Sequence, residues 1–257
     1  MIDIANLPMP LVAAVLLGGL GAIFGSFIAA LVIRWPQDRS VVEGRSCCDH
    51  CGRVLRPIEL IPLVSAALTR GRCRHCRAPI DPIHWRIEAC AVAIGAVAGI
   101  VAPSAEGVAG AVFGWVLLAL AALDIVAFWL PDRLTGLLAI GGAIGGIAGI
   151  GPIAIDRLIG GGVGYGSLWL IAAGYRRLRG REGMGAGDPK LFGAIGLWVG
   201  WQMLPAILLI GSMIGLGVVL SARLRGTAVT ADTALPFGAL LAIAAYPAWL
   251  FMITTAP

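Results

Sequence analysis

Apolar segments long enough to cross a lipid bilayer recur along almost the whole chain. A transmembrane helix needs about 20 predominantly apolar residues, and 59% of these 257 residues are hydrophobic while only 13% are charged. The expected spans lie at about 8–33, 88–103, 107–130, 134–151, 157–175, 189–201, 203–222 and 234–254. The sequence therefore predicts an all-α polytopic membrane protein of about eight transmembrane helices, with seven as the alternative.

Basic residues are distributed unevenly between the two sides that these spans define. Ten arginines lie between Arg34 and Arg86, and with the spans numbered in order only Arg157 falls on the opposite side. The other basic residues on the first side lie mainly at Arg133, from Arg176 to Lys190, and at Arg223 and Arg225. Because loops rich in Lys and Arg stay in the cytoplasm, both termini are expected outside. A basic inner face that meets anionic lipid explains the net charge of +5 without nucleic acid.

One extended polar region, at about 34–87, interrupts the apolar pattern and holds five of the six cysteines. Its two C-x-x-C motifs are separated by 21 residues, and four thiolates spaced in this way can close a tetrahedral zinc site. The predicted zinc ligands are Cys48, Cys51, Cys73 and Cys76. We expect three parts in the chain: a first helix at 1–33, a cytoplasmic zinc-binding domain at 34–87, and a membrane core at 88–257.

Alternatives to this zinc site are two disulfides or free thiols, although a reducing cytoplasm disfavours disulfides. Four cysteines leave no open coordination position, so the predicted role of the metal is structural. Cys47 could replace Cys48 as a ligand. We expect His50 and His75 to be solvated, and Cys90 to be a buried apolar residue of the second span.

Two aspartates, Asp124 and Asp188, lie at the edges of apolar segments, where a charge is costly and usually functional. Asp124 lies seven residues before Pro131, so at 1.5 Å per helical residue it is expected about 10 Å inside the cytoplasmic boundary. The segment 189–201 is too short to cross a core of about 30 Å unless it begins at a similar depth. The two carboxylates are therefore expected at one depth.

A glycine-rich stretch, 183–187, would form a re-entrant approach to Asp188, with this residue as the helix N-cap and Pro189 as the first helical residue. Two carboxylates in a poorly solvated site are expected to share a proton, as in aspartic proteases. One would then activate water and the other would bond the carbonyl oxygen under attack. From these residues alone the alternative stays open that Asp188 only caps a helix and Asp124 pairs with an arginine.

Further motifs accompany the cysteines and the aspartates along nearly the whole chain. They are Gly25-Ser26-Phe27 with Arg34 and Pro36, Ile61-Pro62-Leu63, Arg70-Gly71-Arg72-Cys73, Glu88, Leu130-Pro131-Asp132, and Glu182-Gly183-Met184-Gly185-Ala186-Gly187-Asp188 with Lys190. In this combination the chain resembles the bacterial type IV prepilin peptidases, membrane aspartyl proteases whose G-x-G-D motif is similar to that of presenilin-type proteases.

The resemblance implies that Asp124 and Asp188 are catalytic, that Cys48, Cys51, Cys73 and Cys76 bind zinc, and that Asp132 is not catalytic. It implies a multi-pass protein of the bacterial inner membrane, with its active site near the cytoplasmic face. The implied substrates are prepilins or pseudopilins of a type IV pilus or type II secretion system. Many members also methylate the new N-terminus with S-adenosylmethionine.

This sequence departs from the family pattern at three positions. Ala29 stands where Asn is frequent, Asp49 replaces a common Pro, and Pro189 follows the catalytic Asp. The aspartate pair is unaffected by these changes, and the methyltransferase activity is the one they bring into question. Two other classes of function remain: a proton-coupled transporter that uses both aspartates as relay groups, which leaves the cysteines unexplained, and a zinc-bearing scaffold without chemistry.

Overall fold

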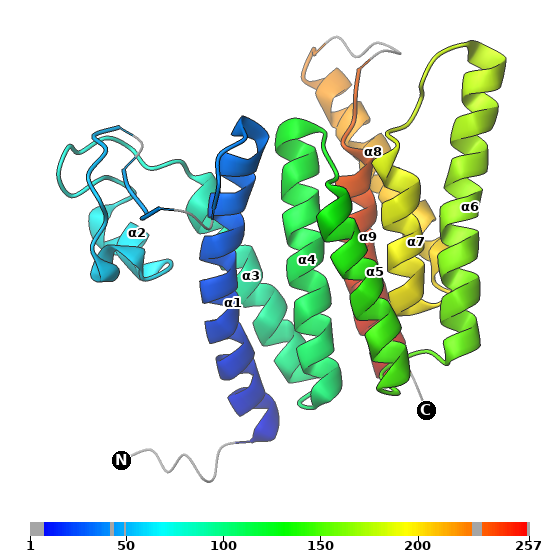
Figure 1. Ribbon diagram of the computed structural model, residues 1–257, viewed down its shortest axis with the longest axis horizontal. Coiled ribbons are helices and arrows are strands. Elements are labelled where there is room, and N and C mark those ends of the chain that lie inside the picture. Colours follow the sequence, from blue (N-terminus) through cyan, green and yellow to red (C-terminus); the bar gives the residue numbers. More distant parts are fainter. Residues whose placement is uncertain (1–7, 42–43, 49, 228–232, 256–257) are drawn as a thin grey trace. The chain divides into compact units, whose positions relative to one another are not determined.

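The computed structural model describes residues 8–41, 44–48, 50–227 and 233–255. Within these residues the chain is all helical, as predicted, with two isolated β-bridges and no strand. The helices are α1 (Met9–Arg34), η2 (Trp35–Gln37), η3 (Pro57–Leu60), α2 (Val64–Thr69), α3 (Ile83–Val101), α4 (Ala105–Ala127), α5 (Asp132–Ile147), α6 (Ala154–Arg179), α7 (Gly187–Val199), α8 (Leu204–Leu224) and α9 (Phe237–Thr255) (Figure 1).

A helix occupies each of the eight predicted spans, but the eight differ in whether they are long and apolar enough to cross a bilayer. Among the described residues, five are long and apolar enough: α1 with its extension to Gln37, α3, α4, α8 and α9. The helices α5 and α7 have only 16 and 13 residues, and α6 carries charges at both of its ends. The chain is therefore a multi-pass membrane protein, while the count of eight spans stays a prediction.

The chain divides into two compact units, Met1–Ala119 and Leu120–Pro257. In the first unit, α1 packs along α3 at glycines whose missing side chains let the backbones approach. A Cβ atom at Gly25 would lie 2.8 Å from Cα of Glu88. Trp115 joins this pair from α4: its indole N–H donates to the carbonyl oxygen of Ala91 at 2.9 Å, and its ring stacks on Phe24 at 4.8 Å.

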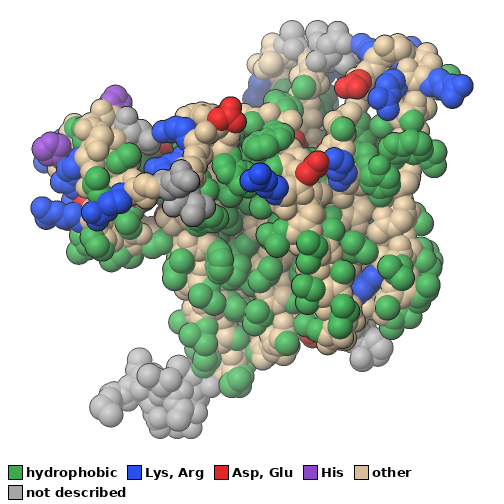
Figure 2. Space-filling view, in the orientation of Figure 1, with side chains coloured by type: hydrophobic (Ala, Val, Ile, Leu, Met, Phe, Trp, Pro, Cys, Tyr) green, Lys and Arg blue, Asp and Glu red, His purple; other side chains and the backbone are tan. Residues whose placement is uncertain are grey.

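In the second unit the helices run up and down, so that one end of the bundle collects the basic residues (Figure 2). Arg176, Arg177 and Arg179 lie in the last turn of α6, and Arg223 in the last turn of α8. The short helix α7 packs against α5, α6 and α9, and ten of its 13 residues are buried. A helix that is apolar on nearly every side, as α7 is after Lys190, is expected to be buried in this way.

The contact between α6 and α7 depends on glycine facing glycine. A Cβ atom added at Gly160 would overlap the carbonyl oxygen of Gly196, and one added at Gly196 would overlap the carbonyl oxygen of Gly160. Small residues allow this close approach of helices in lipid. No phosphate-binding sequence follows the glycines from 160 to 166. Some of these glycines instead position α7 by packing against it.

Arg157 is the one basic residue that the predicted topology assigns to the opposite side, and it is buried rather than solvated, with 4% of its surface exposed. Its guanidinium donates to the carbonyl oxygens of Gly142 at 2.8 Å, Leu197 at 2.7 Å and Pro152 at 2.8 Å, and also to that of Ile150. Gly142 and Leu197 lie near the ends of α5 and α7, where a cation is favoured by the helix dipoles. Arg157 thus fixes the end of α7 opposite to Asp188.

We predict that Gly160→Ala destabilises the protein, because the added methyl group must push α6 away from α7. Overpacking of a close contact costs about 1–3 kcal/mol, which should lower the thermal midpoint of the purified protein in detergent. Gly162→Ala, on the same helix with nothing within 4 Å of its Cβ position, should not lower the midpoint and can raise it, since Ala favours a helix more than Gly does. Equal midpoints for the two variants would contradict the close contact.

Candidate functional site

Asp124 lies in the last turn of α4, and 5% of the residue's surface is exposed. The helix ends three residues later at Ala127, because Phe128 has a left-handed backbone with φ of 49°. Oδ2 of Asp124 accepts a hydrogen bond from the backbone N–H of Ala239, in the first turn of α9, at 2.8 Å. Within the described residues no arginine or lysine pairs with Asp124, so the predicted alternative of an ion pair is wrong.

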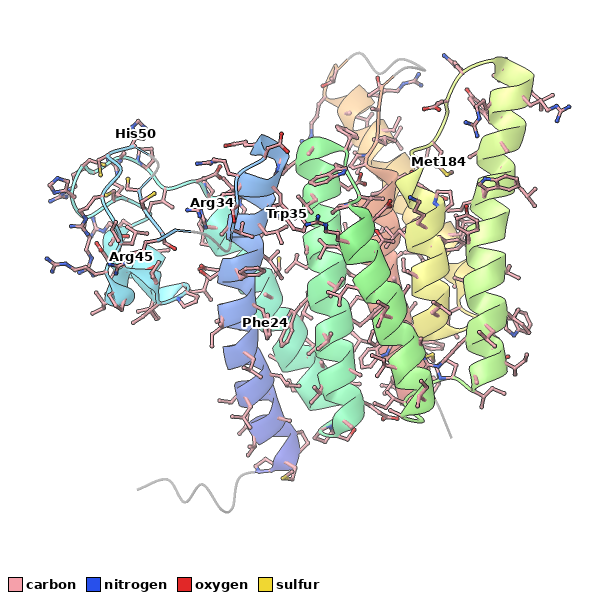
Figure 3. The ribbon with its side chains drawn as sticks, viewed as in Figure 1. Phe24, Arg34, Trp35, Arg45, His50 and Met184 are labelled. Atoms are coloured by element: carbon pink, nitrogen blue, oxygen red, sulfur yellow. The ribbon has the colours of Figure 1, made fainter. Side chains whose placement is uncertain are left out.

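Asp188 lies at the other end of a helix, in the first turn of α7, and is also 5% exposed. The residue at the N-cap is Ala186, so the predicted N-cap role of Asp188 is wrong, and Pro189 is the third helical residue rather than the first. The carboxylate instead accepts a hydrogen bond at Oδ2 from the backbone N–H of Gly185 at 3.0 Å. The loop before α7, in which Met184 lies close to the start of the helix (Figure 3), thus supports the carboxylate.

Gly238, at the start of α9, lies between the two carboxylates. A methyl group added there would lie 3.1 Å from Oδ2 of Asp124 and 3.1 Å from Oδ1 of Asp188, so the two oxygens lie within twice that distance of each other. The same methyl group would lie 2.6 Å from a methyl carbon of Leu130, whose side chain also packs on Gly187. The fold therefore brings together two buried carboxylates from helices that are 60 residues apart in the chain.

Gly238 and Ala239 were missed from the sequence, although Pro236-Phe237-Gly238 at the start of the last apolar segment is a signal that could have been followed. The predicted helix to residue 130 is also too long, so the inferred depth of about 10 Å for Asp124 rested on residues after Ala127 that are not helical. Asp132, expected to be non-catalytic, is exposed and pairs with Lys190 at 2.7 Å.

The cysteine region of the first unit contains two hairpins built on the same plan. In the first, the N–H of Cys48 bonds the carbonyl oxygen of Arg53, and Gly52 closes the turn with φ of 67°. In the second, the N–H of Cys73 bonds the carbonyl oxygen of Ala78, and Arg77 closes the turn with φ of 61°. Each hairpin presents both of its C-x-x-C thiols to the other hairpin.

The four thiol sulfurs of Cys48, Cys51, Cys73 and Cys76 lie within 4.8 Å of one another. Cys48 and Cys76 are 3.8 Å apart, which is about the edge of a tetrahedron of sulfurs at 2.3 Å from zinc. Cys47 is not part of this cluster, although it neighbours Cys48 in the chain. The four residues predicted as ligands therefore form a cluster that could hold a zinc ion.

Backbone groups prepare one of these thiols for metal binding. The N–H groups of Cys76 and His75 lower the pKa of Cys73 to about 6. The pKa of Cys76 is raised to about 11, because desolvation and the thiols of Cys73, Cys51 and Cys48 outweigh the N–H of Ala78, which lowers it. Thiols packed this closely resist full ionisation until a cation compensates their charge.

The remaining candidates are not members of either cluster. His50 and His75 are exposed, and His50 lies at the outer edge of the cysteine region (Figure 3). Cys90 is exposed on α3, so its predicted burial is wrong. Ala29 is fully buried in α1, and Asp49 lies outside the described residues.

These observations define a class of protein: an all-helical, multi-pass membrane protein with an adjacent pair of buried carboxylates and a separate four-cysteine cluster. Comparison with known families agrees with this description. Residues 20–102 match the Bacterial Peptidase A24 N-terminal domain, and residues 111–220 match the Type IV leader peptidase family. The chain belongs to the type IV leader peptidase family.

Curated relatives carry the name prepilin leader peptidase/N-methyltransferase. The protein of Aeromonas hydrophila is 40% identical over 232 residues, covering 84% of this chain and 77% of the relative. That of Burkholderia pseudomallei (strain 1026b) is 42% identical over 211 residues, covering 80% and 67%. That of Stutzerimonas stutzeri is 34% identical over 272 residues, covering 96% and 93%. No solved structure matches the chain.

We predict that Cys48→Ser reduces the zinc content of the purified protein well below one ion per chain, because it removes one of four clustered thiolates. Cys47→Ser is the matched control and should retain the wild-type zinc content, since Cys47 lies outside the cluster. Elemental analysis measures both. If the Cys47 variant lost zinc and the Cys48 variant kept it, Cys47 would be the zinc ligand in place of Cys48.

Proposed function

We propose that the protein is an aspartic endopeptidase that removes the basic leader from type IV prepilins and pseudopilins. The observation that carries this proposal is the pair of carboxylates, Asp124 and Asp188, buried on either side of Gly238. The names of the relatives support the substrate class. We also propose that the chain has three parts, 1–33, 34–87 and 88–257, and that the last part is the peptidase.

The geometry of the pair suits hydrolysis of a peptide bond. Two buried carboxylates this close together cannot both ionise cheaply, so they hold one proton between them. The ionised carboxylate takes a proton from the attacking water, and the protonated one donates a hydrogen bond to the peptide carbonyl oxygen. Backbone N–H groups of Ala239 and Gly185 orient one oxygen of each carboxylate, which reduces the cost of placing them for the reaction.

The position of the pair fits a substrate that enters from the basic end of the second unit. Asp124 and Asp188 lie at the helix ends that share this end with Lys190 and the last turn of α6. By the positive-inside rule this end is cytoplasmic, so we place the site near the cytoplasmic face of the bacterial inner membrane. A prepilin whose apolar helix enters the bilayer would present its cleavage site there.

We propose that the protein also methylates the new N-terminus, with S-adenosylmethionine supplying the methyl group. The N-methyltransferase in the names of the relatives supports this second activity. Zinc at Cys48, Cys51, Cys73 and Cys76 would have a structural role, because a loop of this size gains most of its stability from a metal and four cysteines leave no open position. The proposed function involves no nucleic acid as a partner.

We predict that Asp124→Asn and Asp188→Asn each abolish cleavage of a purified prepilin, with a loss of about 10²–10⁴-fold or more. Asn keeps an acceptor for the backbone N–H groups but cannot exchange a proton with water or substrate. Asp132→Asn, which alters only an exposed pair with Lys190, should cleave at close to the wild-type rate.

Retained cleavage in either active-site variant would refute the two-carboxylate mechanism. If, in contrast, the wild-type protein did not cleave the prepilin, the two other classes of function would be favoured. A proton-coupled transporter would still show proton-dependent uptake that both variants lose. A zinc-bearing scaffold would show neither activity and would be unaffected by either substitution.

We predict that Gly238→Ala lowers kcat for cleavage by about tenfold or more, since its methyl group would crowd both carboxylates and a small displacement of catalytic groups is costly. KM and the thermal midpoint should change little, because the nearest other clash, at 2.6 Å, is with the end of the flexible Leu130 side chain. Gly217→Ala on α8, with nothing within 4 Å of its Cβ position, is the control. An unchanged kcat would mean that Gly238 does not set the spacing of the pair.

A further inference from the structure

A cavity of about 200 Å³ lies in the first unit, between the end of α1, the start of α3 and the two cysteine hairpins. Its walls include the apolar side chains of Leu60, Ile80 and Trp85, and Glu88 is part of its lining. Sites that enclose a whole drug-sized ligand usually measure about 300–1,000 Å³. This cavity is therefore suited to enclose one end of such a ligand.

Glu88 is the unusual group in this cavity. Only 7% of its surface is exposed, and it lies on the helix α3, which is long and apolar enough to cross a bilayer. Oε2 accepts the backbone N–H of Leu63 at 2.8 Å, and among the described residues no cation pairs with the carboxylate. Arg34 also lines the cavity, but it forms no ion pair with Glu88.

The other acidic groups of the cavity already have partners. Both oxygens of Glu59 accept from Arg53 at 2.5 Å, and Oδ1 of Asp81 accepts from the N–H of Ile83 at 2.9 Å. A buried carboxylate is retained where a cation or several donors compensate it. Glu88 therefore fits a ligand that brings its own positive charge into the cavity.

We propose that this cavity binds the amino-acid end of S-adenosylmethionine, with the Glu88 carboxylate accepting hydrogen bonds from its α-ammonium group. The inference rests on the methyltransferase part of the proposed function. When bound, the donor supplies a methyl group from its sulfonium to an amine. The N–C bond forms as the S–C bond breaks, the thioether product leaves, and the methylated amine releases one proton.

The reaction's charges favour the ammonium of the donor over the two other cations present. A carboxylate beside the acceptor amine would stabilise its protonated, unreactive form. A carboxylate beside the sulfonium would stabilise a charge that is lost in the reaction, and would therefore slow methyl transfer. The α-ammonium keeps its charge throughout, so Glu88 can bind it without a penalty in the chemical step.

Equilibrium binding of labelled S-adenosylmethionine and of S-adenosylhomocysteine to the purified, zinc-loaded protein tests this assignment. Both ligands carry the α-ammonium, but only the first carries the sulfonium. Glu88→Gln keeps an acceptor for the N–H of Leu63 and removes the charge. A hydrogen bond to a charged group contributes about 1.5–3 kcal/mol, so we expect both affinities to fall by about tenfold to a hundredfold.

Glu88→Asp, which keeps the charge, should retain part of the affinity, and it serves as the second variant if Glu88→Gln does not fold. Glu106→Gln is the matched control, since it removes one carboxylate of the same unit outside the cavity, and its affinities should equal those of the wild type. Zinc content and thermal midpoint report whether each variant is folded.

The assignment would be overturned if the folded Glu88→Gln variant bound both ligands with affinities within twofold of those of the wild type. A loss confined to S-adenosylmethionine would also overturn it, because the carboxylate would then serve the sulfonium. Wild-type protein that cleaves a prepilin but binds neither ligand would refute the methyltransferase activity itself, and the inference with it.

Discussion

The second unit depends on one constraint: two carboxylates must be buried beside each other, and within the described part of the chain no cation pairs with either of them. Asp124 and Asp188 are each 5% exposed, and each is bonded by a backbone N–H. Such bonds compensate part of the cost of burial. Glycine favours this close approach at two places, since a Cβ atom would lie 3.1 Å from both carboxylates at Gly238 and 3.2 Å from Oδ2 of Asp188 at Gly185.

The sequence predicted the helices and both clusters because each has a local signal. Apolar runs mark the helices, and C-x-x-C spacing identified the four thiols that the structure brings within 4.8 Å. The family motifs singled out Asp124 and Asp188, and the structure brings their carboxylates together. Helix ends were less predictable: Phe128 takes a left-handed conformation that a bulky residue rarely adopts, and α7 begins two residues early.

Features that depend on contacts between distant segments could not be predicted. Gly238 lies between the two carboxylates because α9 packs at the ends of α4 and α7. No local sequence pattern indicates this packing. In the sequence Arg157 was the one basic residue that fell on the opposite side, and the structure surrounds it with four carbonyl oxygens from the ends and connections of neighbouring helices. Glu88 was a family marker without a role until the cavity showed a buried carboxylate with which no cation of the described residues pairs. In each case the sequence supplied the residue, and tertiary structure supplied its partners.

The two proposed activities make opposite electrostatic demands, which gives a physical reason for separate sites. Peptide cleavage uses carboxylates that compete for a proton, whereas methyl transfer needs a neutral amine. An α-amino group titrates at about 7.7–8.0 in water, so a useful fraction is neutral near pH 7.5. Beside two carboxylates the same amine would stay protonated, and its nitrogen would have no lone pair for attack. The new N-terminus must therefore leave Asp124 and Asp188 before it can be methylated, and cleavage and methyl transfer should be separable by substitutions in the two units.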